Sequence, residues 1–215
     1  METIRPLSHA PFLAVAGLIG AGKSTLARLL AAYLNWTAYF EPVEDNEYLE
    51  DFYKDMTRWG FAMQVYLLNE RFMLHQRIQW SELPAIQDRT IYEDTIFASI
   101  LAKRGHIHPR DYKTYLRLFT RMTRSLVRPS LIVYLDTSVE TAYSRICKRA
   151  RGAEVSITTD YLTDLREGYE TFVKDMSVST PVLRVPWDEI RPIEDLAVVI
   201  RDELQRGEPR EVRWG

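Results

Sequence analysis

Residues 12–25 read FLAVAGLIGAGKST. The apolar run before Gly17 is typical of a buried strand. Gly17–Ser24 match the spacing of a phosphate-binding loop, in which glycines let backbone N–H groups converge on phosphate oxygens. Leucines recur at helical spacing over residues 24–34, so we expect a helix whose positive end faces the same anion. A glycine-containing turn that happens to precede a helix is the alternative, and the strand–loop–helix order favours nucleotide binding.

The loop predicts the position of ATP and of one metal ligand. Lys23 should reach the β- and γ-phosphates, and the Ser24 hydroxyl should coordinate Mg²⁺. The residues that we assign to ATP binding here are Gly17, Leu18, Ile19, Gly20, Ala21, Gly22, Lys23, Ser24 and Thr25.

The composition is that of an ordinary globular protein. The 215 residues are 46% apolar and 27% charged with a net charge of −2, so nothing global favours nucleic acid or an anionic membrane as a partner. We expect one domain over residues 1–215, with residues 1–11 flexible and lacking the apolar segment of a secretion signal. The single cysteine, Cys147, fits a reducing compartment, and we expect a soluble, cytoplasmic protein.

Strands and helices alternate along the rest of the chain. This order predicts an α/β fold with a doubly wound, five-stranded parallel sheet and helices on both faces. In such sheets ligands bind at the carboxyl ends of the strands. The expected strands lie at 12–16, 37–40, 84–87, 131–135 and 181–186, and the expected helices at 24–34, 47–81 (one or two), 91–104, 109–126, 138–150, 158–175 and 193–205.

Charged residues follow these strands at the edge where a ligand would bind. Glu41 comes just after the second strand, and Asp88–Arg89 follow the third. Phosphoryl transfer to a hydroxyl needs a base, a metal and positive charge on the moving group. A cluster of basic residues, Arg145 to Arg151, ends a helix; by itself it is best read as a solvated helix end. Beside a phosphate loop we favour an arginine lid over ATP, at residues 145–157.

At this point the sequence resembles the deoxynucleoside kinases, particularly the branch of deoxyguanosine, deoxyadenosine and deoxycytidine kinases. The resemblance runs from about Phe12 to about Tyr169, and the order of its motifs is more specific than any one of them. The matching stretches are the loop at 17–24, Glu41–Pro42–Val43, Tyr53–Lys54–Asp55, Trp59 to Gln64, Asp88–Arg89–Thr90–Ile91–Tyr92 and Arg145-x-x-x-Arg149-x-Arg151-x-x-Glu154.

The resemblance implies roles for individual residues. Glu41 matches the carboxylate that takes the proton from the 5′-hydroxyl, and Arg89 the arginine that positions that hydroxyl and the base. Asp88 stands where the family often has glutamate, thought to help Ser24 hold Mg²⁺. The remaining matches are Tyr53 and Glu154 for the sugar 3′-hydroxyl, Gln64 for the edge of the base, Phe97 for stacking on the base, and Arg145, Arg149 and Arg151 for the transferring phosphoryl group.

Arg71 and Asp94 match a charged pair of the purine and deoxycytidine branch. Such a pair offers donors and acceptors to exocyclic groups of the base, and polar groups left unpaired by a wrong base are costly. We therefore favour deoxyguanosine or deoxyadenosine as the substrate, with deoxycytidine as the next candidate.

Two other classes of protein share the phosphate loop. A nucleoside monophosphate kinase, such as a thymidylate kinase, would need basic side chains at the acceptor site in place of Glu41 and Tyr53. A non-catalytic nucleotide-binding module would hydrolyse ATP slowly and bind a partner protein. The resemblance also implies a homodimer, for which the long helices at 47–81 and 109–126 could supply an apolar face.

Overall fold

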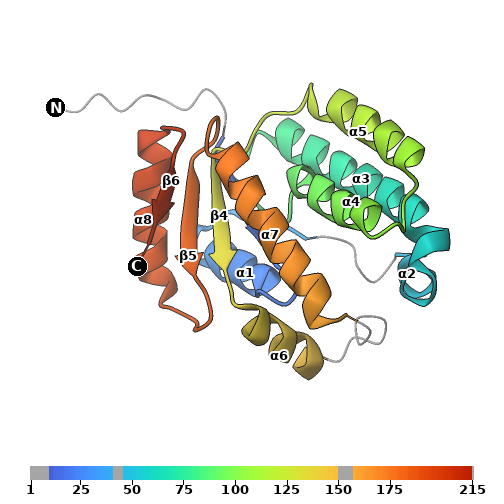
Figure 1. The fold of residues 1–215 in the computed structure, drawn as a ribbon. Coiled ribbons are helices and arrows are strands. Elements are labelled where there is room, and N and C mark those ends of the chain that lie inside the picture. The colour runs from blue at the N-terminus through green and yellow to red at the C-terminus, as the bar shows by residue number, and fades with distance from the viewer. Residues whose placement is uncertain (1–9, 41–45, 150–156, 215) are drawn as a thin grey trace.

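A computed structural model describes residues 10–40, 46–149 and 157–214, and Figure 1 shows its ribbon. The described strands form one parallel sheet in the order β2-β3-β1-β4-β5-β6. The doubly wound fold is thus confirmed, and the predicted number of five strands was wrong. The strands are β1 (Phe12–Gly17), β2 (Thr37–Tyr39), β3 (Ala85–Asp88), β4 (Leu131–Asp136), β5 (Val182–Pro186) and β6 (Glu211–Arg213).

Helices cover both faces of the sheet. In Figure 1, α7 runs across the front of β4, with α3, α4 and α5 beside it, and α1 lies behind the sheet. None of the described helices is long and apolar enough to cross a membrane. The helices are α1 (Lys23–Leu34), α2 (Leu49–Lys54), α3 (Met56–Ser81), α4 (Asp94–Lys103), α5 (Pro109–Thr123), α6 (Val139–Arg149), α7 (Thr159–Met176), α8 (Ile193–Arg206) and the short 3₁₀ helix η1 (Ile91–Glu93).

The segment 47–81 forms two helices that meet at Asp55. The Asp55 carboxylate accepts a hydrogen bond of 2.9 Å from the backbone N–H of Arg58 and so caps the start of α3. Asp55 is thus the single residue between the end of α2 and the start of α3.

The strand register brings the predicted site to one edge of the sheet. The inner strands β1 and β3 are buried along their length and β4 is buried up to Leu135, as the apolar runs of β1 and β4 predict. Val15 pairs with Asp88, and the Arg89 N–H donates to the Val15 carbonyl at 3.1 Å. On the other side, Gly17 pairs with Leu135. The end of β3 therefore lies directly beside the start of the phosphate loop.

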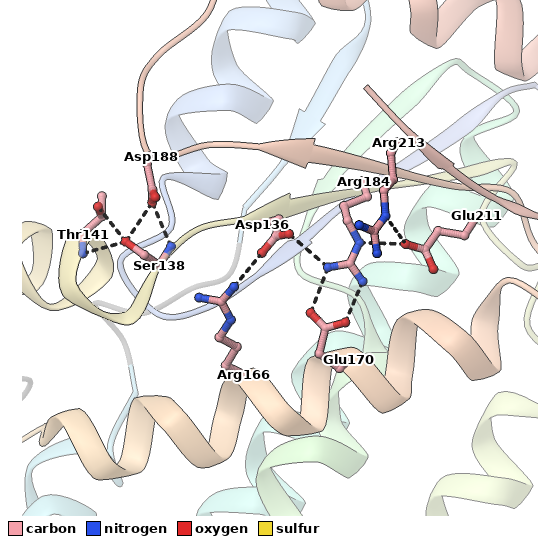
Figure 2. Close-up of polar contacts among 9 residues, drawn as sticks. All are labelled: Asp136, Ser138, Thr141, Arg166, Glu170, Arg184, Asp188, Glu211 and Arg213. Carbon is pink, nitrogen blue, oxygen red and sulfur yellow. Dashed lines mark hydrogen bonds and ion pairs between the residues drawn. The ribbon is translucent and has the colours of Figure 1, made fainter. Parts of the chain in front are cut away.

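The sixth strand, β6, is attached to the sheet by an ion pair as well as by its backbone. Of its three residues only Val212 packs against the core, so no apolar run marks the strand. The Arg184 guanidinium, buried on β5, binds Glu211 at 2.7 Å, Glu170 at 2.7 Å and Asp136 at 3.1 Å (Figure 2). One arginine thus ties β4, β5, β6 and α7 together. The five-strand prediction was wrong because this tertiary ion network leaves no local pattern.

We expect Arg184→Met to lower the free energy of unfolding by about 2 kcal/mol, because three carboxylates lose the buried guanidinium that they share. The loss is moderate because two of the three, Glu170 and Glu211, are exposed to solvent. The hydrogen bond from Arg184 holds the pKa of Glu170 below its ordinary value. This stabilisation is complete above the ordinary glutamate pKa and is lost as pH falls through the lowered one. Urea unfolding should therefore show a difference from wild type that shrinks in acid. Arg117→Met, at an exposed site on α5, is the control.

Candidate active site

The phosphate loop, residues 17–24, joins β1 to α1 and lies against α6. Gly20 has φ 82°, and a Cβ there would sit 2.4 Å from the Ala142 carbonyl oxygen. No larger residue fits without moving α6. Gly22, in the left-handed conformation, precedes α1 and supplies no side-chain cap. The first N–H groups of α1 therefore remain available to an anion.

Lys23 lies within the loop. It is only 8% exposed, and its ammonium donates a hydrogen bond of 2.8 Å to the Leu18 carbonyl oxygen. The ammonium is thus held at the loop, where an anionic phosphate could accept hydrogen bonds from the cation and from backbone N–H groups. The chemistry of this donor set suits a triphosphate.

Ser24 and Asp88, the two expected metal ligands, are hydrogen-bonded to each other. Ser24 comes from the start of α1 and Asp88 from the end of β3, so strand order alone brings them together. Within the described ranges, no cluster of three or more His, Cys, Asp or Glu could hold a metal. A pair of oxygen ligands still fits Mg²⁺, which keeps several waters and binds through few protein groups plus phosphates.

Arg89 follows Asp88 directly after the end of β3. It is 5% exposed, and its backbone is left-handed with φ 64°, unusual for a residue with a side chain. Its guanidinium lies over the Phe97 ring at 4.6 Å and donates to the Tyr169 hydroxyl at 3.1 Å. The structure therefore brings Arg89 together with Phe97, the predicted stacking residue.

Buried polar side chains also lie between α3 and α4. Arg71 and Asp94 form a buried, hydrogen-bonded ion pair that joins the two helices. Gln64, two helical turns before Arg71, is 3% exposed, and among the described residues its side-chain oxygen has no hydrogen-bond partner. Tyr53 on α2 is half-buried and packs against the main hydrophobic core. Buried polar groups of this kind are suited to a polar, planar ligand.

Arg145 links three parts of the site. From α6, its guanidinium donates to the Ala21 carbonyl at 2.9 Å, and to the Trp187 and Asp188 carbonyls at 3.0 and 2.9 Å. It therefore connects the phosphate loop to the turn after β5. The role predicted for it, on the moving phosphoryl group, stays a prediction.

Arg149, the last residue of α6, is exposed. The remaining predicted site residues, Glu41, Arg151 and Glu154, lie outside the described part of the chain, as do most of the expected lid and of the N-terminal segment 1–11.

The turn after β5 contributes more than its sequence indicated. Trp187 is buried, and its indole nitrogen would lie 3.2 Å from a Cβ on Gly22. Asp188 holds Ser138, the residue before α6, accepting from the Ser138 N–H at 2.8 Å and the Ser138 hydroxyl at 3.0 Å (Figure 2). Burial opposes ionisation of Asp188, but these hydrogen bonds outweigh it, so its pKa is lower than usual. The turn is thus fixed against both α6 and the phosphate loop.

Two further residues at the site were missed from the sequence. Glu93 and Tyr169 are fully buried beside Arg89. The spacing Thr90-x-x-Glu93 is a capping-box signal that marks Glu93, and the structure contains that box. Nothing local marks Tyr169, which comes from the middle of α7.

A phosphate loop after the first strand, with a carboxylate at the end of the neighbouring strand, is the arrangement of a P-loop nucleotide-binding protein. The chain belongs to the deoxynucleoside kinase family, because the model of that family matches residues 13–201.

Curated relatives and solved structures agree with this assignment. A deoxyadenosine kinase of Dictyostelium discoideum is 46% identical over 90% of this chain and 79% of its own. A deoxyadenosine/deoxycytidine kinase of Bacillus subtilis (strain 168) is 37% identical over 87% of this chain and 88% of its own. The structure of a deoxyadenosine kinase from M. mycoides with bound dCTP is similar with a TM-score of 0.79, at 31% identity over 91% of this chain and 99% of that one.

Proposed function

We propose that this protein transfers the γ-phosphoryl group of ATP to the 5′-hydroxyl of a deoxynucleoside in nucleotide salvage, with deoxyadenosine or deoxyguanosine favoured and deoxycytidine next. One observation carries the proposal. The phosphate loop, the Ser24–Asp88 pair and Arg89 meet at one sheet edge, and the Arg71–Asp94 pair is buried between α3 and α4. Relatives named as deoxyadenosine, deoxyadenosine/deoxycytidine and deoxyguanosine kinases support it.

In the proposed reaction, charged side chains hold the phosphates of ATP and activate the hydroxyl of the nucleoside. The loop N–H groups and Lys23 hold the β- and γ-phosphates, and Glu41 takes the proton of the 5′-hydroxyl as it attacks the γ-phosphorus. Arg145, Arg149 and Arg151 stabilise the negative charge of the moving group. Mg²⁺, when bound, would neutralise phosphate charge and would be held by Ser24 and Asp88.

The nucleoside would be held by groups around Arg89. Tyr53 and Glu154 bind the 3′-hydroxyl, Phe97 stacks on the base, and Gln64 reads its edge. The Arg71–Asp94 pair would account for a purine preference, because exocyclic groups of the right base would hydrogen-bond with the buried charged pair and a wrong base would offer it no matching partner.

We expect kcat/KM for deoxyadenosine or deoxyguanosine to exceed that for thymidine by ~10²-fold or more, as hydrogen-bonded specificity pockets allow. Purified protein, MgATP and a panel of deoxynucleosides test this, with each product identified by mass. A clear preference for thymidine would contradict the role given to Arg71 and Asp94.

The same panel separates the other two classes of protein. With thymidylate included as an acceptor, phosphorylation of thymidylate alone would indicate a nucleoside monophosphate kinase. ATP hydrolysis without a phosphorylated product would indicate a non-catalytic nucleotide-binding module.

The working form of the enzyme is proposed to be a cytoplasmic homodimer. In support, α3 and α5 expose apolar side chains such as Met73 and Leu118, and the single cysteine suits a reducing compartment. Light scattering on the purified protein gives the mass that tests the dimer.

A further inference from the structure

The Tyr169 hydroxyl lies between Arg89 and Glu93. It accepts a hydrogen bond of 3.1 Å from the Arg89 guanidinium and donates one of 2.6 Å to the Glu93 carboxylate. Arg89 is 5% exposed, and Tyr169 and Glu93 are fully buried. A buried arginine is thus joined to a buried carboxylate through one phenol.

Both neighbours of this hydroxyl are fixed by other contacts. The second oxygen of Glu93 accepts from the Thr90 N–H at 2.8 Å, so the carboxylate belongs to the capping box that starts η1. The Tyr169 ring stacks on Tyr134 at 5.7 Å and meets Phe172 edge-on at 6.0 Å. The hydroxyl therefore has little freedom to move.

The hydroxyl also stays protonated. Burial raises the pKa of Tyr169 well above its ordinary value; nearby Arg89 lowers it, and the charge and hydrogen bond of Glu93 raise it further. A protonated phenol beside a carboxylate donates to it and turns a lone pair towards Arg89. The direction of the two hydrogen bonds is set by this chemistry.

We propose that Tyr169 is a positioning residue for Arg89, with Glu93 as the anchor that fixes its hydroxyl. Arg89 is the residue assigned to hold the 5′-hydroxyl and the base, so this inference rests on the proposed function. The Phe97 ring supports one face of the guanidinium at 4.6 Å, and the Tyr169 hydroxyl fixes an Nη atom at its edge. Together they determine where the arginine presents its remaining donors.

The test removes the hydroxyl and keeps the ring. We expect Tyr169→Phe to lower kcat/KM for the deoxynucleoside by ~10-fold or more, the usual cost of a lost hydrogen bond to a charged group. KM for ATP should stay close to wild type, because the phosphate loop is untouched.

Tyr134→Phe is the matched control. Tyr134 is fully buried, stacks on Tyr169, and its hydroxyl has no hydrogen-bond partner among the described residues. It should retain wild-type kinetics and a thermal midpoint close to that of wild type, because its hydroxyl makes no hydrogen bond to the described residues. Equal losses of activity in the two variants would show a packing role and overturn the proposal, as would an unchanged kcat/KM in Tyr169→Phe or an equal rise in KM for ATP.

A second variant tests the anchor. Glu93→Gln keeps an acceptor for the Thr90 N–H, since glutamine also closes a capping box, but its amide nitrogen cannot accept from Tyr169. We expect the same selective loss for the nucleoside, and little further loss in the double variant, because the two residues act through one contact.

Additive losses in the double variant would overturn the coupling between Glu93 and Tyr169. If Tyr169→Phe does not fold, Glu93→Gln alone decides the outcome: an unchanged nucleoside kcat/KM rejects the proposal. Absence of nucleoside phosphorylation by the wild-type protein would instead overturn the proposed function, and this assignment with it.

Discussion

Lys23→Met is expected to lower kcat for nucleoside phosphorylation by ~10³-fold, the upper range for loss of a preorganised charge at the transition state. Lys23 is buried within the loop, and its ammonium lies 2.8 Å from the Leu18 carbonyl oxygen. Methionine has a similar length and no charge, so the core of the loop remains filled. What is lost is the cation that we propose meets the β- and γ-phosphates as charge moves between them.

Steady-state kinetics on the preferred nucleoside measure this effect, and calorimetry measures ATP binding separately. Lys113→Met, at an exposed position on α5, is the control for the loss of one positive charge and should match wild type. Turnover near the wild-type value in Lys23→Met would contradict the loop as the site of transfer. A thermal midpoint far below that of wild type would attribute the loss to folding instead.

The part of the site that the sequence predicted is the part that strand order determines. Ser24 and Asp88 are 64 positions apart, yet Asp88 directly follows one predicted strand and Ser24 ends the loop that follows another. Because carboxyl ends of parallel strands share one edge, such residues meet whatever the helices between them do. The same argument placed Arg89 beside the loop, where the structure has it.

The parts that were missed depend on contacts between helices or on isolated charges. Tyr169 reaches Arg89 from 80 positions away, and nothing in the periodicity of α7 distinguishes it from the buried residues around it. The strand β6 has one apolar residue in three, and its place in the sheet follows from the Arg184–Glu211 pair. Side-chain pairing of this kind is a property of the packed structure.

Arg145 shows a related limit. The basic run around it predicted positive charge near ATP, and the structure has its guanidinium on three backbone carbonyls of the phosphate loop and the turn after β5. A run of arginines predicts where charge gathers along the chain. It does not say which guanidinium binds the protein and which binds the substrate, because that depends on the turns packed beside the helix.

Glu41→Gln is expected to lower kcat by ~10²-fold or more, as for a lost general base, while binding of the nucleoside is largely kept. Glu41 lies outside the described residues, two positions after β2 ends at Tyr39. Tyr39 pairs with Gln87, the residue before Asp88, so the chain leaves β2 beside the edge where Asp88 and Arg89 lie. Glutamine keeps the hydrogen bond to the 5′-hydroxyl and cannot take its proton.

The pH dependence distinguishes a base from a residue that only binds the sugar. In the wild-type protein, kcat should fall as the pH drops below the pKa of the catalytic carboxylate, because the protonated form cannot accept the proton of the hydroxyl. In Glu41→Gln this acid limb should disappear together with most of the turnover. Glu47→Gln, at an exposed position a few residues on, should keep both the limb and the rate. If Glu41→Gln raises KM for the nucleoside and leaves kcat and its pH profile unchanged, Glu41 binds the sugar and another group is the base.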